Sequence, residues 1–101
     1  MEKSKVMTKS KVIVRGDRSG VFFGNLKERN GQEVTLTDCR RLWYWSGAAS
    51  ISQIAAEGVK NPGECKFTMS VSEIIILDAI EIIPCTEEAI QNINSVKVWK
   101  L

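Results

Sequence analysis

The chain has 101 residues, of which 44% are hydrophobic and 26% charged, with a formal net charge of +2 and no histidine. This length fits one domain of modest stability rather than two domains. Without histidine the chain lacks the commonest general base and metal ligand, and Ser–His and Cys–His nucleophile pairs are excluded. We therefore expect a protein that is not a conventional enzyme and that holds neither a catalytic metal nor a cofactor.

Residues 1–10 are rich in lysine and serine and predict a flexible N-terminal arm, followed by a single domain at residues 11–101. The arm lacks the apolar centre of a signal peptide, and no apolar run approaches the ~18–20 residues that span a membrane. The cysteines are odd in number and form no Cys-X-X-Cys pair, which is typical of reduced thiols. These features predict a cytoplasmic protein with free thiols at Cys39, Cys65 and Cys85.

Charge is distributed unevenly along the chain. Residues 1–60 carry 11 Lys/Arg and 6 Asp/Glu, a net charge of +5, whereas residues 61–101 carry 3 and 6, a net charge of −3. A basic half attracts anions such as phosphate, nucleotides or nucleic acid. A solvated basic surface without a ligand explains the same pattern, and both interpretations stay open.

The first half of the chain predicts an antiparallel meander. Alternating apolar residues indicate strands at residues 11–15, 21–29 and 32–37, and Asn30-Gly31 is the strongest short hairpin signal. Residues 40–45 then predict a fourth strand. Strand periodicity places Arg41, Trp43 and Trp45 on one face of it and Arg40, Leu42 and Tyr44 on the other.

The second half predicts two short helices among further strands. Ser50 and Gln53 have capping-box spacing, so a helix is expected from about residue 51 with its stop at Gly58. Thr86 is expected to cap the second helix. Residues 65–71 and 96–101 predict strands, and residues 73–83 predict two short strands or one bent strand. The expected fold class is α+β, mostly antiparallel sheet of about six or seven strands in a meander or partial barrel.

The most unusual segment of the sequence is residues 40–52, which we interpret as a nucleotide-like pocket. Indoles can stack on a base, and arginine can hold a phosphate through two parallel hydrogen bonds. The small residues that follow would let a ligand approach the backbone, and a helix N-terminus favours an anion. The predicted ligand-binding residues are Arg40, Arg41, Trp43, Trp45, Ser46, Gly47, Ala48, Ser50 and Ser52.

A purely structural role explains the same residues. The tryptophans would then be core or interface residues, Ser50 only a helix cap, and Gly47 and Ala48 a means of tight strand–helix packing. Two other segments are weaker candidates. Residues 20–25 carry two glycines that suit a close backbone approach, and Trp99 in the predicted last strand suits a contact between subunits, because edge strands pair readily.

The run Arg41-Leu42-Trp43-Tyr44-Trp45-Ser46-Gly47-Ala48-Ala49-Ser50 resembles a family of small phage and prophage proteins. The resemblance extends through Gln53, Glu57-Gly58, Asn61-Pro62, Cys65-Lys66-Phe67, Ile82 and Val98-Trp99. It implies a virus-encoded protein of the host cytoplasm, but it carries no agreed activity and therefore transfers no functional residue. In kind of site alone, the chain is similar to the anti-defence proteins by which phages sequester cyclic-nucleotide signals.

These observations lead to three functional hypotheses. The first is a homo-oligomer that binds and sequesters a nucleotide-like ligand, such as a cyclic nucleotide, without turnover. The second is a protein–protein interaction module, either an inhibitor of a host protein or a structural component of a phage. The third is a nucleic-acid binder, which the small net charge and the acidic second half disfavour. No membrane partner is expected.

Overall fold

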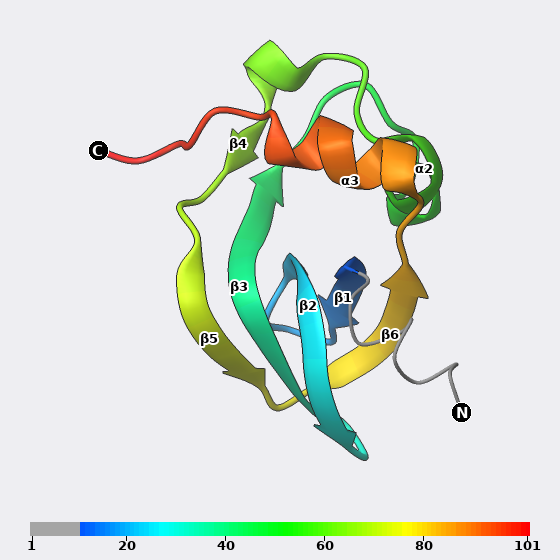
Figure 1. Cartoon of the computed structure of the whole chain (residues 1–101), viewed down its shortest axis with the longest axis vertical. Helices are drawn as coiled ribbons and strands as arrows, with labels where there is room; N and C mark the ends of the chain where they lie inside the picture. Colours follow the sequence, from blue (N-terminus) through cyan, green and yellow to red (C-terminus); the bar gives the residue numbers. More distant parts are fainter. Residues whose placement is uncertain (1–10) are drawn as a thin grey trace.

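The computed structural model describes residues 11–101; the arm predicted at residues 1–10 lies outside this range. Six antiparallel strands form one sheet, and two helices lie side by side at one end of it (Figure 1). The predicted α+β class with a mainly antiparallel sheet is therefore confirmed. The strands are β1 (Lys11–Gly16), β2 (Val21–Asn30), β3 (Glu33–Tyr44), β4 (Lys66–Phe67), β5 (Val71–Ile76) and β6 (Ala79–Pro84).

The sheet curls into a partial barrel because its two ends are joined by a short turn. β1, β2 and β3 form the predicted meander, β6 adds to the free edge of β1, and β4 and β5 share the free edge of β3. β5 and β6 follow each other in sequence yet lie on opposite edges of the sheet (Figure 1). The Ala79 amide donates to the Gln32 carbonyl at 3.0 Å, which ties the β2–β3 hairpin to the start of β6.

β3 is one strand of 12 residues, so the prediction of separate strands at residues 32–37 and 40–45 is wrong. The two segments are joined through Asp38, a non-glycine residue with a φ of 49°. The pairing with β2 shifts register at this point, as at a β-bulge. The extra residue changes which side chains of β3 point toward which face, and it sets the orientation of the residues that follow.

Buried side chains form two clusters on opposite faces of the strands. In β1 and β2, Val14 and Phe22 point into the curl of the sheet, whereas Ile13 and Phe23 point toward the helices. The first cluster, here called the curl core, contains Val12, Val14, Phe22, Val34, Leu36, Cys39, Ile76 and Ala79. The second, the helix-side core, contains Ile13, Phe23, Leu42, Ile54, Ala55, Val59, Cys65, Phe67, Ile93 and Val96.

Both helices begin where the sequence predicts them. Helix α2 (Ile51–Glu57) is capped by the Ser50 hydroxyl, which accepts from the Gln53 amide, and it ends at Gly58. Helix α3 (Glu87–Asn94) is capped by the Thr86 hydroxyl in the same way. No helix within residues 11–101 is both long and apolar enough to cross a membrane.

The last segment of the chain is not the strand predicted at residues 96–101. Its only ladder contact within the described residues is a single parallel bridge between Val98 and Phe67. The Trp99 amide donates to the Phe67 carbonyl at 2.9 Å, which holds this tail beside β4. β4 itself has two residues, so it offers too short a partner for a longer ladder.

Candidate functional site

Arg40 lies inside the molecule and not in a binding site. Arg40 is 6% exposed, and its guanidinium donates to five backbone carbonyl oxygens at 2.9–3.5 Å. Burial lowers the pKa of this guanidinium from its usual value. The acceptors belong to Phe67, Thr68, Ile93, Val96 and Lys97. Arg40 therefore ties β3 to β4, to the end of α3 and to the tail, and it has no donor left for a phosphate.

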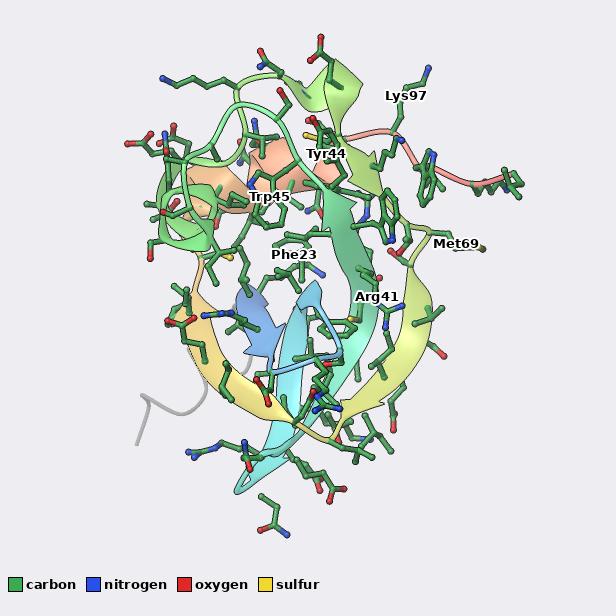
Figure 2. The ribbon with its side chains drawn as sticks, turned by 180° about the vertical axis from the view of Figure 1, so that it is seen from behind. Phe23, Arg41, Tyr44, Trp45, Met69 and Lys97 are labelled. Carbon is green, nitrogen blue, oxygen red and sulfur yellow. The ribbon has the colours of Figure 1, made fainter. Side chains whose placement is uncertain are left out.

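Arg41 points to the other face of β3 and is exposed. Its guanidinium carbon lies 4.7 Å from the centre of the Phe22 ring, a cation–π distance. Within residues 11–101 its side chain makes no ion pair and no hydrogen bond. Figure 2 places Arg41 between β3 and β5, away from the helices. The arginine predicted to hold an anion thus has its donors free within the described part of the chain.

Trp43 and Trp45 lie near Arg41 and differ from each other in burial. Trp43 is 59% exposed, whereas Trp45 is half-buried and packs against the helix-side core. Together with Arg41 they line an open hollow of about 590 Å³, which we call the Arg41 hollow. The hollow is completed by Ser19, Gly20, Val21 and Leu42. The three residues predicted to share a face of the strand line one hollow, but so does Leu42 from the face predicted to lie opposite, and Trp45 packs toward the helix side with it.

A second hollow, of about 470 Å³, lies on the other side of Arg41. Its walls include Phe22, the aliphatic residues of β5 and the following turn, among them Ile74, Ile75 and Leu77. Arg41 and Ser19 belong to the walls of both hollows. The guanidinium consequently lies between an indole-lined surface and an aliphatic one.

The loop between β1 and β2 forms one wall of the Arg41 hollow, and Asp78 holds it in place. The Asp78 carboxylate accepts from the amides of Arg18 and Ser19 at 2.8 and 3.1 Å and from the Ser19 hydroxyl at 2.6 Å. The Ser19 hydroxyl, followed by the Arg18 amide, lowers the pKa of this carboxyl below its usual value. Sequence reasoning missed this wall because Asp78 lies 59 positions from Ser19.

The turn between β3 and α2 does not face the Arg41 hollow with its predicted polar groups. The Ser46 hydroxyl accepts from the Asn61 side-chain amide at 3.0 Å. Gly47 has a φ of 95°, and a Cβ placed there would lie 2.6 Å from the backbone nitrogens of Lys60 and Asn61. This glycine therefore permits close packing of two backbone segments and not the approach of a ligand.

The start of α2 is likewise occupied by its own residues. The Ser50 hydroxyl accepts from the Gln53 amide at 3.2 Å, and the Gln53 side chain accepts from the Ala49 amide at 2.8 Å. Ala48 packs against the helix-side core, and Ser52 is exposed. We therefore leave Arg40 and the whole Ser46–Ser52 segment out of the candidate site.

Trp43 has a partner that lies far from it in the sequence. Its ring stacks on Trp99 with centroids 5.0 Å apart and an interplanar angle of 23°. The Lys66 ammonium lies 5.5 Å from the centres of both indoles and 6.0 Å from that of Tyr44. We call Trp43, Tyr44, Lys66 and Trp99 the aromatic face. The exposure of Trp99 could be suspected from its lysine neighbours, but its stacking on Trp43 could not.

In the weaker candidate segment, residues 20–25, both phenylalanines have a structural role. Phe22 and Phe23 are each 1% exposed and belong to different cores. At Gly24 an added Cβ would lie 3.0 Å from Cys39, so this glycine allows β2 to approach β3 closely. Phe22 also forms the floor beneath Arg41.

The Cys39 and Cys85 thiols offer no reactive thiolate at neutral pH. All three cysteines are free. Burial raises the pKa of Cys39 to about 11 and that of Cys85 to about 11, so both stay protonated near pH 7. Within residues 11–101 no group of three metal-ligating side chains is found together.

Comparison with known families gives one match that covers most of the chain. Residues 9–93 match the family model described as Domain of unknown function (DUF6948). The chain belongs to this family. A search of curated proteins finds no match. The matched range contains the Arg41 hollow, but it ends before Trp99 and therefore includes only part of the aromatic face.

Proposed function

We propose that this protein binds a nucleotide-like anion in the Arg41 hollow and holds it without converting it. The observation that carries the proposal is the exposed Arg41 guanidinium, which has no carboxylate partner among residues 11–101 and lies beside two indoles. Arginine binds phosphate through paired hydrogen bonds, and indoles stack on bases. Trp43 and Trp45 supply the apolar surface next to the cation.

The size of the hollow fits a small ligand. Small-molecule sites usually measure about 300–1,000 Å³, and the Arg41 hollow of about 590 Å³ lies within this range. The adjoining aliphatic hollow gives a second place for a larger ligand to lie against, with Arg41 between the two. A cyclic dinucleotide, which has two bases and two phosphates, uses such a divided surface better than a mononucleotide does.

The chemistry of the chain favours binding over catalysis. It has no histidine, and the raised pKa values of Cys39 and Cys85 keep these two thiols protonated at neutral pH. The Asp78 carboxylate is engaged by the loop that it holds. Together with the resemblance to phage proteins, this supports sequestration of a signalling nucleotide in the host cytoplasm as the biological role.

Isothermal titration with cyclic di-AMP, cyclic tri-AMP and cyclic ADP-ribose tests the proposal. We expect saturable binding of at least one of them. Arg41→Ala should weaken it by about 10- to 100-fold, because a charge-assisted pair of hydrogen bonds is lost. Arg15→Ala is the matched control: it removes one exposed arginine, which pairs with Glu81 at 3.7 Å and does not line the hollow. If the folded protein binds none of the three ligands, the proposal fails.

A protein–protein interaction module is the second candidate, and one observation favours it. Ile75, Leu77 and Ile80 around the β5–β6 turn are 53%, 73% and 48% exposed. Such a group of large apolar side chains is typical of contact surfaces. An absence of heat in the titrations, combined with a stable oligomer in sedimentation velocity, would favour this candidate over nucleotide binding.

A further inference from the structure

The aromatic side chains of the aromatic face are exposed to solvent and do not contribute to either core. Trp43, Tyr44 and Trp99 are 59%, 50% and 39% exposed, and none of them belongs to either core. Trp43 and Trp99 come from β3 and from the tail, and they meet only because the tail runs beside β4. A stacked pair of exposed indoles presents flat apolar surface to solvent, which a soluble protein usually reserves for a partner.

One lysine contacts this face, and two more lie on the tail that carries Trp99. The Lys66 ammonium is equally far, 5.5 Å, from the centres of the two stacked indoles, so it lies beside the stack. Lys97 and Lys100 lie on the tail next to Trp99, and Figure 2 shows Lys97 projecting outward from it. Glu64, the nearest acid to Lys66 in sequence, has its carboxylate 3.5 Å from the Ser46 hydroxyl.

Although the second half of the chain is acidic, the segments that build the aromatic face carry its lysines. Residues 61–101 have a net charge of −3 and contain only three Lys/Arg residues. All three belong to the segments that build the aromatic face, namely Lys66, Lys97 and Lys100. The acidic residues of this half belong instead to η1 (Pro62–Glu64), to β5, β6 and the turn between them, and to the start of α3. The acidic character of the second half therefore does not disfavour nucleic acid at this surface.

We propose that the aromatic face binds single-stranded nucleic acid. Unpaired bases stack on exposed aromatic rings in a manner that tolerates any sequence, while lysines along the path neutralise the phosphates. A duplex has its bases stacked internally, so it cannot use the indoles. A second copy of the chain suits the face less well, because a two-fold axis there would bring the lysines of both copies together.

The proposal does not depend on the Arg41 hollow. Trp43 contributes to both surfaces, but Trp99 and Lys66 do not line the hollow, and Arg41 is not part of the aromatic face. Variants at Trp99 and Lys66 therefore test strand binding, whereas variants at Arg41 test nucleotide binding. Either proposal can fail while the other stands.

Fluorescence anisotropy with a labelled 20-nucleotide oligothymidine and a duplex of equal length tests the inference on the full chain. We expect the single strand to bind more tightly than the duplex, with an affinity that falls as salt rises. Trp99→Ala should weaken strand binding about tenfold through the loss of one stacking surface. Trp99→Phe keeps a ring and should restore part of the affinity. The Trp99 backbone amide that holds the tail is present in both variants.

Lys66→Gln provides the electrostatic half of the test. It should reduce the slope of log affinity against log salt by about 0.7, the value for one phosphate contact on a single strand. Lys60→Gln is the matched control, because Lys60 is also exposed and contacts no aromatic ring among the described residues.

Four results would overturn the inference: no binding at 50 mM salt, equal binding of the duplex, an unchanged affinity in a folded Trp99→Ala variant, or binding of polyglutamate in place of the strand. A wild-type dimer that Trp99→Ala converts to a monomer, without any strand binding, would assign the face to self-association. Thermal unfolding of each variant verifies that the fold is intact. Loss of strand binding in Trp99→Ala with unchanged nucleotide titrations separates this face from the Arg41 hollow.

Discussion

Arg40 and Arg41 are consecutive residues of β3 whose guanidinium groups have opposite surroundings. Arg40 is 6% exposed and donates to five carbonyl oxygens, whereas Arg41 is exposed and lies over the Phe22 ring with no side-chain hydrogen bond among residues 11–101. Successive side chains of a strand point to opposite faces, so neighbours in sequence face different partners. The same residue type therefore serves as an internal tie on one face and as an available cation on the other.

This contrast extends to the rest of the two faces. On the helix side, polar groups near β3 have partners within the chain: Asn92 exchanges hydrogen bonds with the backbone of Val59, and Ser46 accepts from Asn61. On the side of β3 that carries the Arg41 hollow, here called the open side, Arg41 and Trp43 are exposed and can contact solvent or a partner. Substitutions on the helix side should consequently alter stability, and substitutions on the open side should alter binding.

The largest expected effect is that of Arg40→Met. Methionine fills part of the volume but removes the guanidinium donors from five carbonyl oxygens, of which, within residues 11–101, only those of Phe67 and Ile93 also accept from the Trp99 and Val96 amides. An unsatisfied buried polar group costs about 1–3 kcal/mol. Since some of these oxygens can gain water, we expect the free energy of unfolding to fall by about 3 kcal/mol or more. Urea denaturation measures this loss. Arg40→Lys keeps the charge but reaches fewer carbonyls, so its loss should be smaller.

A decrease below about 1 kcal/mol for Arg40→Met, the range of an ordinary surface change, would contradict the assignment of Arg40 as an internal tie. The contrast with Arg41 would then also be lost. If Arg40→Met instead remained stable but lost nucleotide binding, the original sequence-based placement of Arg40 in the ligand site would be the better interpretation.

The next effect is that of Gly47→Ala, which tests whether this glycine serves packing or a ligand. An alanine there would adopt a φ of 95° and place its Cβ 2.6 Å from two backbone nitrogens. Strain of this kind costs about 1–3 kcal/mol, so the melting temperature should fall. Gly63→Ala is the control, because nothing lies within 4 Å of a Cβ at Gly63. Unchanged stability together with weaker nucleotide binding would return Gly47 to the binding site.

Sequence patterns predicted the local elements of this protein well. The hairpin at Asn30-Gly31, the caps Ser50 and Thr86, and the meander depend on neighbouring residues, and they are confirmed. The separate fourth strand and the last strand are not. The bulge at Asp38 and the two-residue β4 are set by how strands meet in space, and no local pattern reveals them.

The candidate site was predictable only in part, for the same reason. Alternation placed Arg41, Trp43 and Trp45 on one face. All three line one hollow, but Trp45 packs with Leu42 against the helix-side core, because the strand is irregular between Leu42 and Tyr44. The pairing of Trp43 with Trp99 and the hold of Asp78 on the β1–β2 loop join residues more than 50 positions apart. Composition identified an aromatic and basic segment. Only the fold shows that the Arg40 guanidinium is hydrogen-bonded inside the protein, whereas the Arg41 guanidinium is exposed.

The smallest expected effect is that of Asp78→Asn, which tests whether Asp78 fixes the β1–β2 loop as a wall of the Arg41 hollow. The folded state lowers the pKa of Asp78 below the ordinary value of 3.8, chiefly through the Ser19 hydroxyl. The ionised form therefore stabilises the fold at any pH above about 4, and this contribution disappears as the pH falls through the lowered value. The melting temperature of Asp78→Asn should consequently lie below that of the wild type at pH 7, and the two should converge in acid once the Asp78 carboxyl is protonated.

Asp17→Asn is the matched control, since the Asp17 carboxylate makes no hydrogen bond within residues 11–101 and lies in the same loop. A difference between Asp78→Asn and wild type that stays constant from pH 7 into acid in which the Asp78 carboxyl is protonated would mean that the carboxylate charge does not hold the loop. Because Ser19 and Gly20 are walls of the Arg41 hollow, a loosened loop should also weaken nucleotide binding at pH 7, though less than Arg41→Ala does. Equal stability of the variant with unchanged binding would show that the hollow forms without this wall, and the open side would then depend on β3 alone.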